Sequence, residues 1–248
     1  MCAKWYESNK KLFAEERDSL AGKYPFLKME VLPSETRINK VCSLRTEAAI
    51  VSGIHRLSIL ESQRYLDYRI AIVLPDNYPK IVPTMFCNDK KLPIGNIDRH
   101  IMSDGSACLG VIAEISQKWC SNPRIVPFLD EIVSPFLVWQ AYYDAHEQPP
   151  PWGQRSHYGE GILEFYSEIL ELPNEPNIVE FMKLLARKNN PKGHEECPCG
   201  SGKKLRDCHH KNVSKAHESI AWHDAKTDLL NIGNKSEKNV RLNSYMNT

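Results

Sequence analysis

Residues 100–119, HIMSDGSACLGVIAEISQKW, place a single cysteine between a turn signal and a large aromatic residue. The pair Asp104-Gly105 is typical of turns, and Trp119 is large enough to anchor the segment in an apolar core. Cys108 lies between these two features. The arrangement predicts a thiol held at the surface of a packed domain, and Cys108 is therefore the first candidate for a nucleophile.

The composition is that of an ordinary globular chain. Its 248 residues are enough for one domain with a core and a small appendage. The 32 Lys and Arg residues balance 31 Asp and Glu residues, which gives no global signature of nucleic-acid or membrane binding. No apolar run approaches the ~20 residues that cross a bilayer, and the charged N-terminus lacks the apolar centre of a signal peptide. We expect a cytoplasmic protein with no membrane partner.

The cysteines are unevenly distributed along the chain. Five are scattered and three are clustered near residue 200, namely Cys2, Cys42, Cys87, Cys108 and Cys120, then Cys197, Cys199 and Cys208. In a reducing compartment, metal binding or catalysis is a better default for such thiols than disulfide formation. A cytosolic cysteine without motif context is usually a small buried side chain. We expect Cys87 and Cys120 to be core or surface thiols of this kind.

Hydrophobic periodicity predicts an α+β fold for the first part of the chain. A helix is expected over 4–21, and strands over 26–32, 41–45, part of 48–60, 65–74 and 84–87. Prolines between 75 and 83 predict a rigid turn before the last of these strands. After Trp119 the apolar residues recur at helical spacing over 125–137, where Pro135 should kink the helix or split it. Two more helical patterns follow, over 162–170 and 178–185.

This order of elements resembles the ubiquitin-conjugating enzyme family over about residues 5–145. The residues that carry the resemblance are Tyr78, Pro79 and Pro83 of the proline turn, His100, Gly105, Cys108 and Leu109 of the active-site segment, and Trp119 with Pro123. The resemblance implies an antiparallel four-stranded sheet flanked by helices, and Cys108 as the residue that carries an acyl group as a thioester. His100-Ile101-Met102 stands eight residues before the cysteine, where the family usually has His-Pro-Asn ten residues before it.

The group that would stabilise the oxyanion is therefore unassigned, because the family's asparagine is missing. Backbone amides of the Asp104-Gly105 turn are one source of donors, and His100 is either a catalytic helper or a structural neighbour of Cys108. His157 either lines the same groove or is a structural histidine. These features, with the segment 152–162, are similar to prokaryotic members of the family.

The similarity to prokaryotic members implies a role in antiviral (CBASS-type) defence. The implied acyl donor is the C-terminus of a ubiquitin-like modifier or of a cGAS-like nucleotidyltransferase. No Gly-rich phosphate loop appears in the sequence, so activation is expected from a separate activating enzyme or an already activated donor. Two other hypotheses remain open: a non-catalytic binding module of the same fold, and an adaptor for RNA, ribosome or protein.

A second constellation follows near the end of the chain. Cys197, Cys199, Cys208 and His209 offer three thiolates and one imidazole, a donor set that suits tetrahedral zinc. His210 competes as the fourth ligand. The run resembles the Cys-x-Cys-x8-Cys-His (SEC-C) motif of the secretion ATPase SecA, and it implies a structural Zn2+ because all four positions are filled by the protein.

Basic residues surround this motif. The stretch Lys183–Lys215 holds nine Lys or Arg and three acidic residues. Such a surface is either a docking site for an acidic protein or RNA, or simply a solvated face.

The expected organisation has four parts along the chain. They are a conjugating-enzyme-like core over 1–146, a proline linker with additional helices over 147–190, a zinc-binding motif over 191–212, and a polar, partly disordered tail over 213–248.

Overall fold

The computed structural model describes residues 4–59, 64–151, 155–156, 159–173 and 176–232. The chain forms two compact units. The first comprises Met1–Leu109 and Lys118–Gly153, and the second comprises Gly110–Gln117 and Gln154–Thr248. Helix α3 (Ile112–Ser121) begins in the second unit and ends in the first. The expected core of 1–146 thus lacks Gly110–Gln117, which pack with the C-terminal helices instead.

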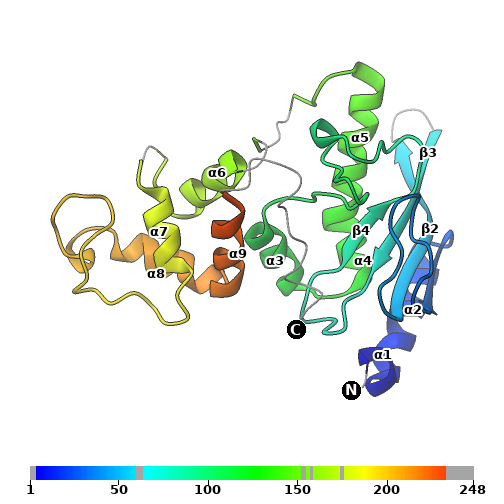
Figure 1. Ribbon diagram of the computed structural model, residues 1–248, viewed down its shortest axis with the longest axis horizontal. Helices are drawn as coiled ribbons and strands as arrows, with labels where there is room; N and C mark the ends of the chain where they lie inside the picture. The colour runs from blue at the N-terminus through cyan, green and yellow to red at the C-terminus, as the bar shows by residue number, and fades with distance from the viewer. Residues whose placement is uncertain (1–3, 60–63, 152–154, 157–158, 174–175, 233–248) are drawn as a thin grey trace. The chain divides into compact units, whose positions relative to one another are not determined.

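The first unit contains a four-stranded antiparallel sheet, as expected (Figure 1). Its strands follow the order β1 (Leu27–Leu32), β2 (Ala48–Ile59), β3 (Arg64–Val73) and β4 (Thr84–Cys87). One row of buried apolar side chains crosses all four strands in register, namely Met29, Val51, Ile72 and Met85. Successive residues of a strand point to opposite faces, so this row forms the centre of the inward face.

The expected strand over 41–45 is wrong. The amide oxygen of Asn39 accepts hydrogen bonds from the backbone amides of Val41 and Cys42, at 2.9 and 2.8 Å, and this turns the chain back. The segment forms only an isolated bridge between Arg37 and Ser43. The loop of residues 33–47 packs its apolar side chains on the sheet, in a buried cluster of Ile38, Leu44, Ala48, Ile50, Ala71, Val73 and Phe86.

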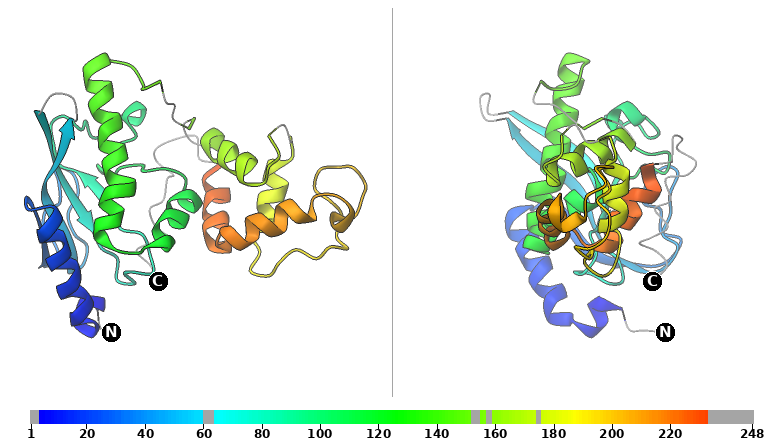
Figure 2. Two further views of the ribbon diagram at one scale, coloured as in Figure 1. Left: turned by 180° about the vertical axis from the view of Figure 1, so that it is seen from behind. Right: turned by 90° about the vertical axis from the view of Figure 1, so that its left-hand side faces the viewer.

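Helices pack against the sheet of the first unit (Figure 1 and Figure 2). The helical elements of this unit are α1 (Trp5–Ser8), α2 (Lys10–Lys23), α4 (Ile125–Phe128), the π-helical turn η2 (Leu129–Val133) and α5 (Ser134–His146), of which α2 contacts β1 and α5 contacts β2. The expected helix over 4–21 is interrupted at Asn9, whose side chain caps α2 by accepting from the Leu12 amide at 3.1 Å. Pro135 directly follows the π-helical turn η2 within one continuous helical run from α4 to α5, so the expected interruption near this proline takes the form of a π-helical turn.

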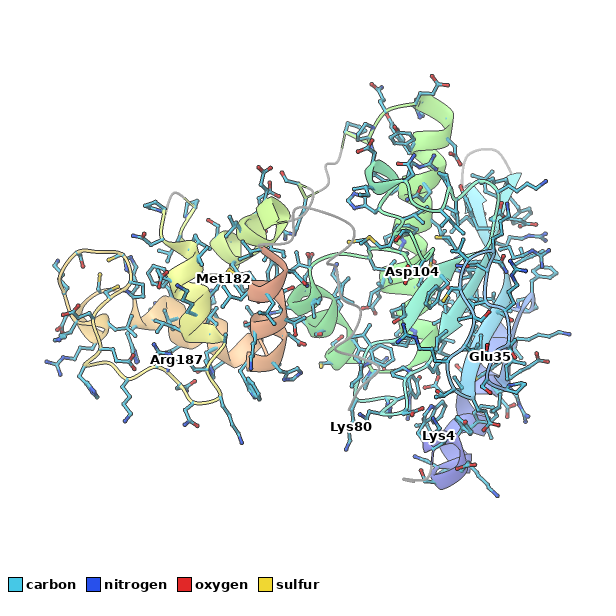
Figure 3. All side chains as sticks on the ribbon, viewed as in Figure 1. Lys4, Glu35, Lys80, Asp104, Met182 and Arg187 are labelled. Carbon is cyan, nitrogen blue, oxygen red and sulfur yellow. The ribbon has the colours of Figure 1, made fainter. Side chains whose placement is uncertain are left out.

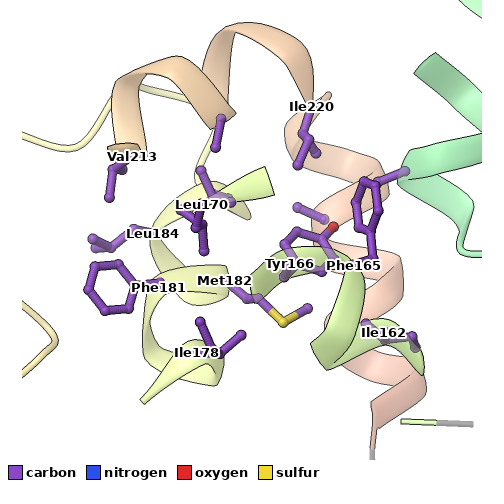
Figure 4. Close-up of a cluster of buried hydrophobic side chains, with 14 of the residues drawn as sticks. Ile162, Phe165, Tyr166, Leu170, Ile178, Phe181, Met182, Leu184, Val213 and Ile220 are labelled. Atoms are coloured by element: carbon purple, nitrogen blue, oxygen red, sulfur yellow. The ribbon is translucent and has the colours of Figure 1, made fainter. Parts of the chain in front are cut away.

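The second unit is helical around its own apolar core. Its helices are α6 (Gly159–Ile169), α7 (Ile178–Leu185), the 3-10 turn η3 (Leu205–Asp207), α8 (His210–Ser219) and α9 (Trp222–Ile232). Figure 4 shows the side chains that meet in this core, among them Phe165, Tyr166, Phe181 and Met182.

The expected polar tail is wrong for residues 213–232. Val213, Ala216 and Ile220 are buried in the core of the second unit, and α9 adds Ala225. The last part of the expected tail, 233–248, lies outside the described residues. Within the part of the chain that is described, no helix is long and apolar enough to cross a membrane.

Candidate functional site

Cys108 stands at the end of a short hairpin that follows β4 and its loop. The hairpin is closed by a bridge between Ile101 and Ala107, and the Ala107 amide donates to the Met85 carbonyl of β4 at 2.9 Å. The backbone amide of Cys108 donates to the carbonyl of His100 at 2.8 Å. The hairpin therefore extends the edge of the sheet, and the thiol follows at the point where this pairing ends. The side chain of Cys108 is exposed.

The turn of this hairpin is held rigidly. Asp104, labelled in Figure 3, accepts hydrogen bonds through Oδ1 from the amide and the hydroxyl of Ser106, at 2.8 and 2.7 Å. Its carbonyl accepts from the Asn39 side chain at 2.9 Å. Gly105 has a φ of 81°, and a Cβ there would lie 2.3 Å from Asn39 Nδ2, so the position requires glycine.

The amide of Gly105 is not available to a substrate. It donates to the Met102 carbonyl at 2.9 Å and completes the turn. The expectation that this turn supplies an oxyanion donor is therefore wrong for Gly105. In the described chain, the amide of Leu109, the residue directly after the thiol, donates to no acceptor.

His100 is brought beside Cys108 through the backbone. It adopts a left-handed conformation with a φ of 54°, and its half-buried ring packs edge-on against Trp139 of α5, with ring centroids 5.5 Å apart. The sequence-predicted pair thus lies on facing arms of one hairpin. His157, the other histidine considered for this groove, lies outside the described residues.

Arg99, the residue before His100, could not be singled out from the sequence. Its guanidinium is buried, pairs with Asp144 at 2.7 Å and lies 4.6 Å from the centre of the Tyr143 ring. Gln140, one helical turn before Asp144, is also buried and bonded to Arg99. The sequence signal that could have pointed to these contacts is the spacing of Gln140, Tyr143 and Asp144. This spacing places the three side chains on one face of a helix whose other residues are largely apolar.

The remaining residues of the expected motif pack the interior. Trp119 and Tyr78 are both buried, and the indole of Trp119 donates to the Pro79 carbonyl at 2.8 Å. Burial raises the pKa of the Cys87 thiol to about 12, as expected of a core cysteine, whereas Cys120 is exposed.

The expected metal ligands gather in the second unit. The ligand atoms of Cys197, Cys199, Cys208 and His209 all lie within 4.8 Å of one another. His209 Nδ1 is 3.2 Å from Cys197 Sγ and 3.3 Å from Cys208 Sγ, and the sulfurs of Cys199 and Cys208 are 3.6 Å apart. In a tetrahedral zinc site with bonds of about 2.0–2.3 Å, ligand atoms lie about 3.5–3.8 Å apart. The set fits such an ion with an adjustment of a few tenths of an ångström.

His209 rather than His210 belongs to this cluster. The Nδ1 atom of His210 lies 3.5 Å from the hydroxyl of Ser214 on its own helix, while the ring of His209 packs edge-on against Phe181 with centroids 5.5 Å apart. Phe181 is buried in the core of the second unit, so α7 supports the imidazole from behind.

A tight loop presents the first two thiols. Cys197 donates its amide to the Lys203 carbonyl at 2.9 Å, and Gly200 and Gly202 adopt positive φ angles of 76° and 70°. The hydrogen bond between the Cys199 thiol and the Ser201 hydroxyl oxygen, 3.2 Å apart, lowers the pKa of Cys199 to about 6. This thiol therefore reaches the thiolate form that a metal requires at neutral pH.

Ion pairs neutralise only part of the basic surface around the cluster. Lys183, Arg187, Arg206 and Lys215 pair with acidic side chains. Among the described residues, five exposed lysines of this stretch form no ion pair, namely Lys188, Lys192, Lys203, Lys204 and Lys211.

Three thiols and an imidazole at these distances form a donor set that fits a zinc ion, and the comparison with known families agrees. Residues 195–211 match the model of the SEC-C motif, a zinc-binding motif. No curated protein and no solved structure matches the chain.

Proposed function

We propose that the first unit is an acyl-transfer enzyme of the ubiquitin-conjugating-like class, with Cys108 as its nucleophile. The observation that carries the proposal is the exposed thiol of Cys108 at the end of a hairpin whose turn and arms are fixed by hydrogen bonds. A structural cysteine needs no such exposure, because free cysteines are among the most buried residues. The four-stranded antiparallel sheet with helices packed against it agrees with the fold that this class requires.

The chemistry follows from the thiol. The Cys108 thiolate attacks the activated carbonyl carbon of the donor, the leaving group departs with its electron pair, and a thioester forms. An amine then attacks the same carbon, the thiolate leaves, and the amine gives up a proton to solvent or to a nearby base such as His100. The backbone amide of Leu109 stabilises the negative oxygen of each tetrahedral intermediate.

The donor and the partners are part of the proposal. The acyl group is the C-terminus of a ubiquitin-like modifier or of a cGAS-like nucleotidyltransferase, activated by a separate enzyme, in a defence role. The resemblance of residues 5–145 to conjugating enzymes supports this assignment.

Intact-mass spectrometry of the full chain, purified from cells that express the neighbouring genes, tests the proposal. We expect an adduct that thiols remove from the wild type, and a thiol-resistant oxyester on the Cys108→Ser variant. Cys120→Ala is the matched control, because Cys120 is the other exposed cysteine among the described residues of the first unit, and it should keep the adduct. Unimpaired conjugation by Cys108→Ala would refute the enzyme and favour a non-catalytic binding module.

We propose a structural zinc ion at Cys197, Cys199, Cys208 and His209. With four protein ligands, the ion has no open position for a substrate, and its contribution is to hold the loop on α7 and α8. Metal analysis of the purified chain should find about one zinc per chain.

The unpaired lysines around the zinc loop favour a second candidate function, an adaptor that docks an acidic partner. RNA is the partner to test first, because its binding should weaken steeply with salt. Lys203→Glu with Lys204→Glu should reduce binding of a fluorescent single-stranded RNA and its salt dependence. Binding that is insensitive to salt and to these changes would exclude the adaptor for RNA.

A further inference from the structure

The backbone that precedes the candidate nucleophile hairpin is fastened to α5 by a reciprocal pair of hydrogen bonds. The Nε atom of Arg99 donates to Gln140 Oε1 at 2.7 Å, and Gln140 Nε2 donates to the Arg99 carbonyl at 2.8 Å. Arg99 is 7% exposed and Gln140 is 0% exposed. Solvent therefore does not compete for these bonds, and one amide side chain fixes both the guanidinium and the main chain of Arg99.

The effect of this pair reaches the thiol through two contacts of His100. His100 follows Arg99 directly, its ring lies against Trp139 of α5, and its carbonyl accepts the Cys108 amide at 2.8 Å. A left-handed φ of 54° at His100 persists only where its surroundings fix it. Gln140 and Trp139 supply those surroundings from adjacent positions of one helix.

We propose that Gln140 and Arg99 are positioning residues for the reaction at Cys108, a proposal that rests on the acyl-transfer function proposed above. Gln140 holds the arm of the hairpin to which the Cys108 amide is bonded, and so fixes the direction of the thiol and of the following Leu109 amide. The carboxylate of Asp144, 2.7 Å from the Arg99 guanidinium, already balances the charge of Arg99. The two hydrogen bonds between Arg99 and Gln140 therefore add orientation rather than charge compensation.

The orientation of a reacting group affects the rate of the reaction more than the binding of the substrate. A misplacement of about 1 Å at a reacting group can cost about 100-fold in rate. A loosened hairpin should thus lower kcat for transfer while KM for the donor stays the same.

Two variants of the full chain separate the two bonds. Gln140→Leu removes both, whereas Gln140→Glu keeps an acceptor for Arg99 Nε and loses the donor to the Arg99 carbonyl. The control is Tyr24→Phe, which removes the 2.6 Å hydrogen bond to Asp130 in the same unit without touching residues 99–108. Hydrogen exchange at the Cys108 amide is the first measurement, because that amide donates to His100.

We expect exchange at the Cys108 amide to be at least about tenfold faster in Gln140→Leu, intermediate in Gln140→Glu, and unchanged in Tyr24→Phe. The kcat for transfer should fall in the same order with KM unchanged. A Cys108 amide that exchanges equally in Gln140→Leu and the wild type would overturn the positioning role. So would a transfer rate that falls equally in Gln140→Leu and Tyr24→Phe.

The exchange measurement needs neither donor nor acceptor, so it is independent of the conjugation assay. A wild-type chain that never carries an adduct would refute the acyl-transfer function, and faster exchange in Gln140→Leu would then show only that the pair holds the hairpin.

Discussion

Replacing His55 by leucine should remove a loss of stability that the wild-type first unit suffers below neutral pH. His55 lies on β2, is 1% exposed and stacks on Tyr24 with ring centroids 5.1 Å apart. Its Nε2 is 3.0 Å from the Ser134 hydroxyl, and its Nδ1 has no hydrogen-bond partner in the described part of the chain. Burial lowers the pKa of this imidazole to about 4, and the charge of Asp130 opposes the shift only in part.

The magnitude follows from the two states of the chain. In the unfolded chain the imidazole has its ordinary pKa of 6.5, so between pH 6.5 and about 4 the unfolded chain binds a proton that the folded chain does not. Because the unfolded state binds more protons in this window, the free energy of unfolding falls as the pH falls. Relative to pH 7.5, the loss is about 2 kcal/mol at pH 5 and about 3 kcal/mol below pH 4.

Leucine carries no titrating proton, so the difference between the wild type and His55→Leu isolates this contribution. The difference is needed because burial raises the pKa of Glu16 in the same unit, and a raised carboxyl pKa changes stability with the opposite sign. Urea unfolding at pH 7.5 and 5.0, followed by tryptophan fluorescence, reports on this unit through the buried Trp5, Trp119 and Trp139. Equal changes in stability for both chains would refute the reasoning.

Three further predictions concern the metal centre and the buried carboxyls. Cys208→Ser should lower bound zinc to well below one per chain by metal analysis, whereas His210→Ala should leave it unchanged. Burial raises the pKa of Asp228 to about 7, so the folded chain keeps a proton that the unfolded chain releases above 3.8. The second unit should therefore lose about 4 kcal/mol as the pH rises from 4 to well above 7. Asp228→Asn should flatten that loss when hydrogen exchange of α9 is measured, and an unchanged slope would contradict it. Tyr78→Phe should cost about 1–3 kcal/mol in urea unfolding, because the buried carboxyl of Glu16 loses a donor, and a cost under about 0.5 kcal/mol would speak against that bond.

The strands of the sheet could be predicted from the sequence where only one face of the strand is apolar. Tyr68, Ile70 and Ile72 alternate with other residues along β3, and this period of two predicts a strand. The segment 41–45 has the same short-range pattern, yet it is a loop. What distinguishes it is the Asn39 side chain, which bonds the amides that a strand would offer to a neighbour. The Asn39 side chain thus competes with strand pairing for these backbone amides, and hydrophobic periodicity does not report such a contact between particular atoms.

Helix α3 and the last two helices were missed for different reasons. Val111, Ile115 and Trp119 recur at steps of four residues, so the signal for α3 was present in the sequence. In α9, Asp228 makes the sequence look polar although its carboxylate is buried. It accepts the amides of Ile112 and Ala113 at 3.2 and 3.1 Å and so caps α3. A buried polar residue of this kind is invisible to a hydrophobicity pattern, because only the tertiary structure supplies its partners.

The two candidate sites differ in the same way: one is built from residues close in sequence, and the other depends on residues from distant segments. The four candidate metal ligands are local in sequence, so their spacing predicted the cluster that the structure contains. The surroundings of Cys108 are not local, since Asn39, Gln140 and Asp144 reach the hairpin from distant segments.

The rigidity of that hairpin bears on the choice between a nucleophile and an idle thiol. Asn39 holds its turn at 2.9 Å, β4 holds one arm, and Gln140 with Asp144 holds the residue before the other arm. Burying Arg99 with its partners is costly, since an apolar set of the same shape is often at least as stable. Such polar anchoring therefore favours a geometric requirement over a need for stability. Because the hairpin ends in an exposed sulfur, the group whose position it fixes is Cys108.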